Sequence, residues 1–419
     1  RTGHAVITTT HANSCKATYY RMVTLCTQKY DMGDKTLYNL VTEAFPIVLF
    51  VKKLEDNSRR VMEITECEIL EDGTRYEGTL FGHKAPVTGE VVFTTGMTGY
   101  QETLTDPSYC GQIVCMTYPL IGNVGIKDID NESAGVRMRG LIVSELCDVP
   151  SNWQMKKTLD QYLNEQGVTG LYGVDTRALT RHVREFGTLR GRIVEGEPTE
   201  EDIVLAKNHE MHDQVAQCTC KEAYDIQGEG KYNIAVMDFG LKRGILRSLL
   251  SRGCTLRVFP ADTDAQTILD SGCDGVMLTN GPGDPQDNPK AIATIRELMG
   301  KKPMFGICLG HQLMALAMGG RTVQMKYGHH GANHPVKDLN RGTCSVTAQN
   351  HGYMVDPEHL PEGAVVSHVN WNDQTVEGVC YTEQNAFSVQ FHPEACGGPC
   401  ETAYLFDDFL AMVMANKEQ

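Results

Sequence analysis

Apolar and amphipathic stretches alternate along the second half of the chain. Residues 232–240 read YNIAVMDFG, an apolar run that ends in a turn, and residues 241–253 carry apolar positions at helical spacing. Apolar runs return at residues 254–260 and just before a glycine-rich turn at 279–284. Apolar runs without polar alternation are typical of parallel strands that helices cover on both faces. The pattern therefore predicts a parallel α/β sheet, whose active site would lie at the carboxyl ends of the strands.

The first half of the chain mixes the patterns of strands and helices. Residues 90–95 and 112–118 are rich in β-branched and aromatic residues and are bounded by turn formers, which predicts two strands with hairpin chemistry. A further strand with a turn is predicted at residues 67–78. Residues 175–187 combine an N-capping acid, apolar residues at helical spacing and a terminal glycine, which predicts a short helix. We therefore expect a smaller, mixed α/β domain here.

A polar, turn-rich stretch that ends in QGEGK separates the two patterns. With 419 residues, the chain suits two domains of ordinary size and an extension. We predict an extension at residues 1–65, the mixed domain at 66–215, a linker at 216–230 and the parallel-sheet domain at 231–419. Residues 1–30 contain no Asp or Glu, as in organellar transit peptides, but we favour an excised fragment or a spurious extension as the explanation.

Composition restricts the class of partner. The chain is 41% hydrophobic and 22% charged, within the range of soluble globular proteins. Its formal charge of −15 opposes binding to nucleic acid or anionic lipid, and its longest apolar stretch, residues 44–51, is too short to span a bilayer. Its 15 cysteines are odd in number and lack the CxxC pairs of zinc sites, which predicts free thiols in a reducing, cytoplasmic setting. The acid-free segment at residues 1–30 leaves targeting to an organelle open as an alternative location.

The run PMFGICLGHQLMALA places a cysteine between a strand and a helix. Cys308 lies at the turn, and the helix begins at Leu309. Gly306 and Gly310 reproduce the spacing of the nucleophile elbow of hydrolases, with a thiol in place of the hydroxyl, and would permit a tight, strained turn. The free N–H groups and the dipole of the helix N-terminus favour the thiolate, the form that attacks carbonyl carbon. We therefore predict that Cys308 is a nucleophile and that the other cysteines are structural.

A base for this thiol is predicted near the C-terminal end of the sequence, in AFSVQFHPEA. His392 and Glu394 follow an apolar strand and are two residues apart, so in extended backbone they project to the same side. Pro393 keeps the backbone between them extended. Glu394 would orient one imidazole nitrogen while the other faces Cys308, which is the arrangement of a catalytic triad.

The turn LTNGPGDP offers backbone donors for an oxyanion. Gly281 and Gly283 leave its N–H groups open to a ligand, and no Lys-Ser or Lys-Thr follows them as a phosphate loop requires. The predicted oxyanion hole combines the N–H of Leu309, directly after the nucleophile, with that of Gly281.

Two further motifs are set aside. Residues 238–240 spell the Asp-Phe-Gly of kinases, but the companion kinase motifs do not occur and a strand-to-helix turn is predicted. The histidines of YGHHGANHPV and QNHGY invite a metal site, yet no carboxylate or cysteine accompanies them at ligand spacing. We predict that they are scaffold and pocket residues, and that no metal is bound.

The motifs GICLGHQ, NGPGDP, QNHGY and FHPEA, in this order, resemble those of the class I, or triad, glutamine amidotransferases. The resemblance implies a parallel α/β fold in which Cys308, His392 and Glu394 form the triad. It also implies that Leu309 and Gly281 donate to the oxyanion. The first domain, with TGEVVFTTGMTGYQETLTDPSYCG and GVDTRALTRHVREFG, further resembles the small subunits of carbamoyl-phosphate synthetases.

This second resemblance extends over about residues 67–414 and implies the partners. Glutamine would be the substrate, and ammonia would pass to a synthetase large subunit, or to fused synthetase domains, that consume bicarbonate and ATP. No cofactor is implied for the glutaminase step, and ATP and magnesium are expected only on the synthetase partner. Ser108 would reach the glutamine from the first domain, and Tyr353 stands where the family also has Phe, which favours packing over a hydroxyl role. The residues implied in glutamine binding are Ser108, Gly281, Gly283, Leu309, Gln312, Asn350, Gly352 and Tyr353.

Two other functions stay open at this point. Cysteine–histidine–acid triads also cleave peptides, and a catalytically silent docking subunit is a further alternative, against which the complete triad argues. The sequence also leaves open whether the chain is a free subunit or part of a fused polypeptide. It does not decide between pyrimidine and arginine synthesis as the destination of the product.

Overall fold

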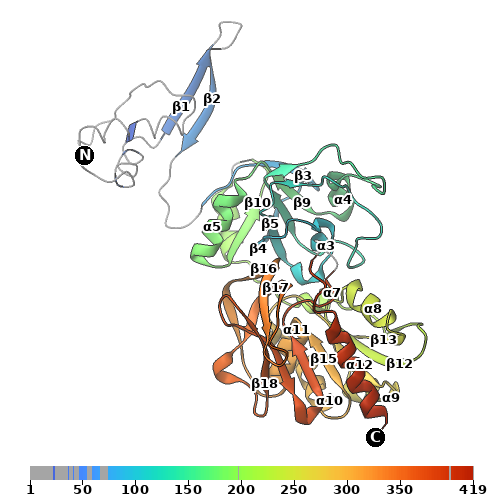
Figure 1. Cartoon of the computed structure of the whole chain (residues 1–419). Coiled ribbons are helices and arrows are strands. Elements are labelled where there is room, and N and C mark those ends of the chain that lie inside the picture. The colour runs from blue at the N-terminus through green and yellow to red at the C-terminus, as the bar shows by residue number, and fades with distance from the viewer. Residues whose placement is uncertain are drawn as a thin grey trace. The chain divides into compact units, whose positions relative to one another are not determined.

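The computed structural model divides the chain into two compact units, Arg1–Arg75 and Tyr76–Gln419. In the first unit, β1 (Ile47–Lys53) pairs with β2 (Arg59–Glu66) in antiparallel fashion (Figure 1). Most of the acid-free segment 1–30, and most of the strand and turn predicted at 67–78, lie outside the described residues. The structure describes residues 22–23, 36, 41, 47–53, 59–66, 74–196, 198–395 and 398–418.

The first half of the second unit is built on a six-stranded sheet with the order β10-β4-β5-β7-β9-β3. Its four inner strands are parallel and its two edge strands antiparallel. The strands predicted at 90–95 and 112–118 are β4 and β5, but they are parallel neighbours and not a hairpin, because α3 and η1 return the chain to the same end of the sheet. The bounds are β3 (Thr79–Gly82), β4 (Val87–Thr94), α3 (Tyr100–Leu104), η1 (Pro107–Tyr109), β5 (Gln112–Met116), β7 (Gly140–Val143), α4 (Leu159–Gln166), β9 (Thr169–Tyr172), α5 (Thr176–Phe186), β10 (Leu189–Ile193) and α6 (Glu200–Lys207), with a small parallel pair β6 (Leu120–Ile121) and β8 (Glu145–Leu146).

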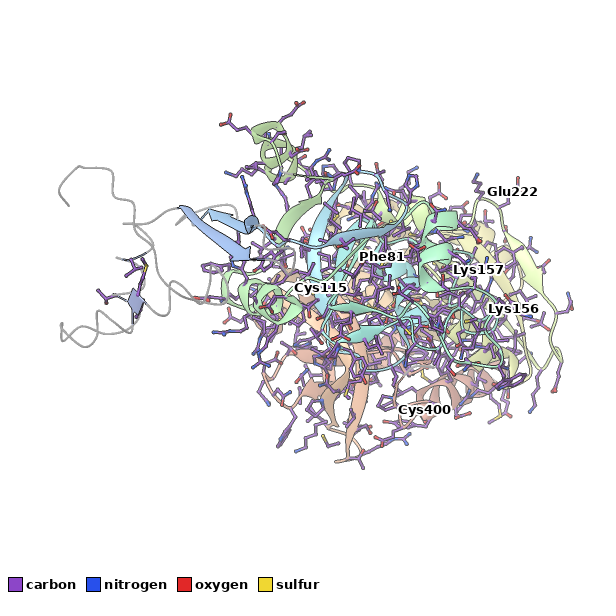
Figure 2. All side chains as sticks on the ribbon, turned by 90° about the horizontal axis from the view of Figure 1, so that it is seen from above. Phe81, Cys115, Lys156, Lys157, Glu222 and Cys400 are labelled. Carbon is purple, nitrogen blue, oxygen red and sulfur yellow. The ribbon has the colours of Figure 1, made fainter. Side chains whose placement is uncertain are left out.

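Helices cover both faces of this sheet. Side chains of α3 and α4 join the core on one face, and those of α5 join the core on the other. The helix α5 begins and ends where the sequence predicts, because the side chain of Asp175 caps it and Gly187 follows its last residue. Phe81 and Cys115 are buried in this half of the unit, whereas Lys156 is exposed (Figure 2).

The second half of the unit is built on a ten-stranded sheet with the order β11-β13-β12-β14-β15-β20-β19-β18-β16-β17. The five strands from β13 to β20 are parallel, as predicted, and antiparallel strands extend the sheet on both sides. Residues 216–230, predicted as a linker, include the end of α7 and the edge strand β11. The bounds are α7 (Gln214–Cys218), β11 (Tyr224–Ile226), β12 (Tyr232–Asp238), α8 (Arg243–Leu250), β13 (Cys254–Pro260), α9 (Ala265–Asp270), β14 (Gly275–Leu278), η2 (Pro285–Asp287), α10 (Pro289–Leu298), β15 (Met304–Ile307), α11 (Leu309–Ala317), β16 (Thr322–Asp338), β17 (Cys344–Val355), η3 (Pro357–His359), β18 (Val365–Asn370), β19 (Val376–Tyr381), η4 (Thr382–Gln384), β20 (Ala386–Val389) and α12 (Tyr404–Lys417).

Two layers of helices bury this sheet. Side chains of α9, α10 and α11 form the core on one face, and those of α8 and α12 form it on the other. On the second face, the ring of Phe305 on β15 stacks on Phe387 of β20 at 4.4 Å and also contacts Phe406 and Phe409 of α12. These aromatic contacts hold β15 and β20 side by side. Among the described residues, no helix has the length and apolar character that crossing a membrane requires.

Strands β16 and β17 join the two halves of the second unit. They form an antiparallel ribbon that Figure 1 draws beside β4. Thr95 N, at the end of β4, donates to the carbonyl of His330 at 3.1 Å, and Thr188 N donates to that of Lys326 at 2.8 Å. Residues of the first sheet can therefore contribute to a site on the second.

Candidate active site

Cys308 occupies a strained position between β15 and α11. Its φ is 54° and its ψ is −104°, a combination that residues with a side chain rarely adopt. The residue is the N-cap of α11, is 2% exposed, and has its Sγ 3.7 Å from the carbonyl oxygen of Asn350. Such strain is retained where the surrounding structure enforces it, and here it presents the sulfur at the carboxyl end of a central strand.

Gly306 and Gly310 serve close packing and not unusual dihedrals. Neither is among the described residues with positive φ. A Cβ on Gly306 would lie 2.7 Å from Met314 Sδ, and one on Gly310 would lie 2.6 Å from the carbonyl oxygen of Leu278. The glycines therefore leave room for the close contacts of the turn, while Cys308 itself adopts the strained dihedrals.

Backbone hydrogen bonds connect the separate motifs. Cys308 N donates to Val389 O at 2.9 Å, which links the nucleophile to the end of β20. Gly310 N donates to Thr279 O at 3.0 Å, which links α11 to the glycine-rich turn after β14. His392 N donates to the carbonyl oxygen of Ala348 on β17 at 2.9 Å. Residues far apart in sequence thus meet at one edge of the sheet.

His392 and Glu394 form a buried pair beside Cys308. Nδ1 of His392 lies 2.7 Å from Glu394 Oε1, and its Nε2 is buried and directed at Cys308. Burial and the Lys242 ammonium lower the pKa of His392, but Glu394 and the nearby Cys308 sulfur outweigh them and raise it to about 10. Burial raises the pKa of Glu394, but Lys242 and His392 outweigh it and hold it at about 2. The arrangement therefore favours an imidazolium between a carboxylate and the sulfur.

Lys242 is a part of this network that the sequence reasoning missed. Its Nζ lies 3.2 Å from Glu394 Oε1 and 3.9 Å from Asp106 Oδ2, and its side chain is only 10% exposed. Burial lowers the pKa of Lys242, but the carboxylates around it raise the pKa above its usual value. The available signal was its position directly after the turn that ends β12, at the same sheet edge as the other motifs.

A cavity of about 330 Å³ opens beside Cys308. This volume lies at the lower end of the range for small-molecule sites. Seven of the eight residues implied in glutamine binding line it, and the eighth, Leu309, is buried next to Cys308 at the start of α11. The seven are Ser108, Gly281, Gly283, Gln312, Asn350, Gly352 and Tyr353.

Ser108 reaches this cavity from the first half of the unit, in the turn η1. Its Oγ accepts a hydrogen bond of 3.0 Å from Asn280 Nδ2, in the turn after β14. On the opposite side, Asn350 is oriented by two contacts, one from His330 Nδ1 to its Oδ1 at 2.8 Å and one from its Nδ2 to Asp106 Oδ2 at 3.3 Å. Burial lowers the pKa of His330 to about 4, so the ring is neutral and donates from Nδ1.

The remaining predicted residues form the wall of the cavity nearest α11. Gln312 Nε2 donates to the carbonyl oxygen of Tyr353 at 2.7 Å and to Gln390 Oε1 at 2.9 Å, which fixes α11 to β17. A Cβ on Gly281 would lie 2.7 Å from Leu309 Cδ2, so the two predicted oxyanion donors belong to adjacent stretches of backbone. Leu309 opens α11, so its N–H has no partner within the helix.

A second, smaller cavity of about 80 Å³ borders His392. His392, Lys242, Asp106, Glu132 and Asn350 are among the residues that line it. Asn350 contributes to both cavities, whereas Cys308 lines only the larger one. Cys308 and His392 thus line different cavities.

Comparisons with known proteins match each half of the second unit to a protein family. The family model described as glutamine amidotransferase class-I matches residues 235–412, and that of the carbamoyl-phosphate synthase small chain, CPSase domain, matches residues 69–193. The carbamoyl phosphate synthase small chain of Bacillus caldolyticus is 52% identical over 348 residues, which cover 82% of this chain and 95% of that relative. The chain belongs to the carbamoyl phosphate synthase small chain family.

Small chains of other bacteria agree with this assignment. That of Bacillus cereus is 51% identical over 353 residues, covering 84% of this chain and 96% of the relative. The small chain of Clostridium perfringens is 50% identical over 343 residues, covering 82% of this chain and 97% of the relative. The family and the mixed α/β fold predicted from the sequence are confirmed, with the class I amidotransferase domain following the small-chain domain.

Proposed function

We propose that this chain hydrolyses L-glutamine to glutamate and ammonia through a thioester on Cys308, and that it supplies the ammonia to a carbamoyl phosphate synthase large chain or fused synthetase domains. One observation carries the proposal. A thiol, an imidazole and a carboxylate follow one another at the end of a cavity large enough for a single amino acid. Membership of the small-chain family supports the choice of partner.

The first half of the reaction forms the thioester. The Cys308 thiolate attacks the side-chain amide carbon of glutamine, and the carbonyl oxygen becomes an oxyanion that accepts from the N–H groups of Leu309 and Gly281. Each such donor contributes about 2.7–4 kcal/mol in the transition state. When the C–N bond breaks, the imidazolium of His392 gives its Nε2 proton to the leaving nitrogen, which departs as ammonia. The raised pKa of His392 supports this role, because it keeps the ring charged until that step.

The second half returns the enzyme to its starting state. Neutral His392 takes a proton from water, and the resulting hydroxide attacks the thioester carbon. The same two N–H groups stabilise the second oxyanion. When the C–S bond breaks, glutamate forms and the thiolate is restored beside the imidazolium of His392. Glu394 holds the ring in position throughout, since it contacts Nδ1 at 2.7 Å.

The small cavity behind the triad supports an exit for ammonia that differs from the entry of glutamine. His392 lines that cavity, so the product of the first step forms at its border. Ammonia would pass from there to the synthetase partner, on which bicarbonate and ATP with magnesium would be used. Pyrimidine and arginine synthesis are both compatible destinations.

The proposal is tested by replacing the sulfur of Cys308 with oxygen. Cys308→Ser should nearly abolish glutamate release, because an alkoxide is far harder to form than a thiolate. Mixed with a carbamoyl phosphate synthase large chain, the variant should still support synthesis from added ammonium. Cys110→Ser is the matched control, since Cys110 lines the same cavity and should not be needed for chemistry.

Three outcomes would contradict the proposal. Glutamate release by Cys308→Ser at the rate of the unchanged chain would mean that another group is the nucleophile. Failure of the unchanged chain to confer glutamine use on the large chain would overturn the partner. Cleavage of peptides in place of glutamine, measured on the same preparation, would assign the triad to a peptidase.

A further inference from the structure

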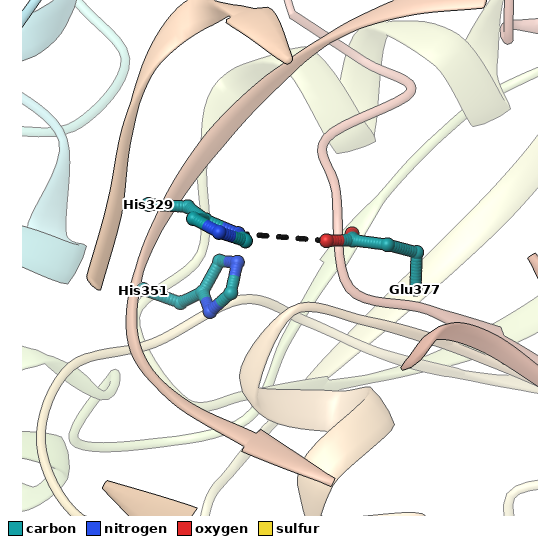
Figure 3. Close-up of side chains that lie close together, drawn as sticks. All are labelled: His329, His351 and Glu377. Carbon is teal, nitrogen blue, oxygen red and sulfur yellow. Dashed lines mark ion pairs between the residues drawn. The ribbon is translucent and has the colours of Figure 1, made fainter. Parts of the chain in front are cut away.

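A second cluster of buried titratable residues lies outside the triad. His329 on β16 and His351 on β17 are direct neighbours in the strand register, and Glu377 comes from β19. One ligand atom from each of the three lies within 4.8 Å of the others, and Glu377 is fully buried. Figure 3 shows His329 facing the carboxylate of Glu377, with His351 beside it.

The contacts of His329 resemble those of a metal-bound imidazole. Its Nε2 lies 2.8 Å from Asp373 Oδ2, while its Nδ1 lies 3.5 Å from Glu377 Oε1 and is buried without a hydrogen-bond partner. A histidine that binds a metal through one nitrogen usually donates the other N–H to a carboxylate or a backbone carbonyl. Asp373 supplies that carboxylate.

The contacts of His351 point to the same centre. Its Nδ1 lies 2.8 Å from the carbonyl oxygen of Tyr353, which can only accept, so Nδ1 carries the proton. Its Nε2 lies 3.0 Å from Gln349 Oε1, which is also an acceptor, so this contact needs either a second proton on the ring or a cation that both atoms share.

The amide of Gln349 cannot be reversed to remove this conflict. Its Nε2 donates to Glu377 Oε2 at 3.0 Å, so a reversed amide would direct its oxygen at the carboxylate. A proton on His329 Nδ1 would pair with Glu377 but would not reach the contact between His351 Nε2 and Gln349 Oε1. One cation bound by His329, His351 and Glu377 would satisfy both contacts.

We propose that His329 Nδ1, His351 Nε2 and the Glu377 carboxylate bind one divalent cation of the zinc class. Two imidazoles and one carboxylate are a donor set that zinc takes, with a fourth position left for water. Nitrogen donors disfavour magnesium and calcium, which prefer oxygen. Asp373, the Tyr353 carbonyl and Gln349 would each hold one ligand in orientation.

In the sequence, no carboxylate accompanies these histidines at ligand spacing, and the pattern therefore predicts scaffold and pocket residues. The structure corrects this reason, since Glu377 reaches the histidines from a different strand, with β18 and β16 between β19 and β17. The proposal does not depend on glutamine hydrolysis. His351 nevertheless lines the larger cavity. A bound cation would therefore stabilise β17, the strand that also carries Asn350 and Tyr353.

The experiment is a zinc titration of the full chain against a chromogenic chelator. It is done on the Cys308→Ser variant, so that the active-site thiol cannot bind the metal. We expect one zinc per chain and, with cobalt as the probe, the visible absorption of a four-coordinate nitrogen and oxygen site. Asp373→Asn should weaken zinc binding by about 10–100-fold, because it removes the negative charge that orients His329 and strengthens it as a ligand. Glu377→Gln should weaken it further.

A matched control distinguishes this site from surface binding. Asp356 pairs with the half-exposed His359 at 2.7 Å as Asp373 pairs with His329, so Asp356→Asn should leave zinc affinity unchanged. Asp373 is itself 43% exposed, so Asp373→Asn should fold even if Glu377→Gln does not. Equal zinc affinity of the two asparagine variants would overturn the proposal. So would the absence of a bound zinc, or a cobalt spectrum with thiolate bands.

Discussion

Removal of the buried ammonium of Lys242 is the sharpest test of the network behind the triad. The Nζ of Lys242 is 3.2 Å from Glu394 Oε1, a separation that gives about 5 kcal/mol of attraction at an effective dielectric constant of about 20. Desolvation of the two charges offsets much of this gain. Loss of one partner of a buried pair usually costs about 3–5 kcal/mol. For Lys242→Met we expect about 3 kcal/mol, at the lower end, because His392 still faces Glu394.

Urea unfolding, followed by fluorescence and circular dichroism, measures this loss. Lys417→Met is the control, because the Nζ of Lys417 lies 2.9 Å from Asp274 but is half exposed, and such pairs contribute about 1 kcal/mol or less. Equal stability of Lys242→Met and Lys417→Met would refute the reasoning.

The same variant should have a kinetic signature. Lys242 lines the small cavity and not the larger one, so it should not contact glutamine. We expect kcat to fall by up to about 100-fold as Glu394 and His392 lose their orientation, with KM unchanged. A rise of KM alone would show that Lys242 acts on substrate binding.

Two further substitutions test the walls of the site. Ser108→Ala should raise KM for glutamine more than it lowers kcat, because the lost contact would act on substrate and transition state alike; steady-state kinetics measures this, and a fall of kcat alone would contradict it. Gly306→Ala should destabilise the chain by about 1–3 kcal/mol in urea unfolding, because its Cβ would lie 2.7 Å from Met314 Sδ. Gly352→Ala, whose Cβ would meet nothing within 4 Å, should unfold at the same urea concentration as the unchanged chain.

Local patterns were sufficient for the elements that carry the chemistry. The parallel strands of the second half and the helix after Cys308 follow from apolar periodicity, and the cap at Asp175 follows from its position before a helical pattern. The order of the motifs at strand ends predicted that they would share one edge of the sheet, and the structure brings Cys308, His392 and Glu394 together there. Their chemical roles stay predictions until the variants are measured.

Contacts between distant segments were beyond this reasoning. Parallel pairing of β4 with β5 depends on how α3 returns the chain, which neither strand encodes. Lys242 is ordinary in sequence and becomes part of the network only because β12 ends at the same edge of the sheet as β15 and β20, with β14 between β12 and β15. Glu377 meets His329 for the same kind of reason, since pairing across β18 brings β19 near β16. Periodicity shows which face of an element is buried, but not which neighbour it faces.

The position of β20 in the sheet has a consequence for the order of events during synthesis. Cys308 is translated long before His392, yet β20, which leads to His392, lies between β15 and β19 in the finished sheet. A nascent chain that ends before β20 therefore has β15 without its neighbour and Cys308 without His392. Cys308 gains its contact with His392 only when this late strand enters the middle of the sheet. On the proposed mechanism, insertion of β20, and not synthesis of the cysteine, is the step that makes glutamine hydrolysis possible.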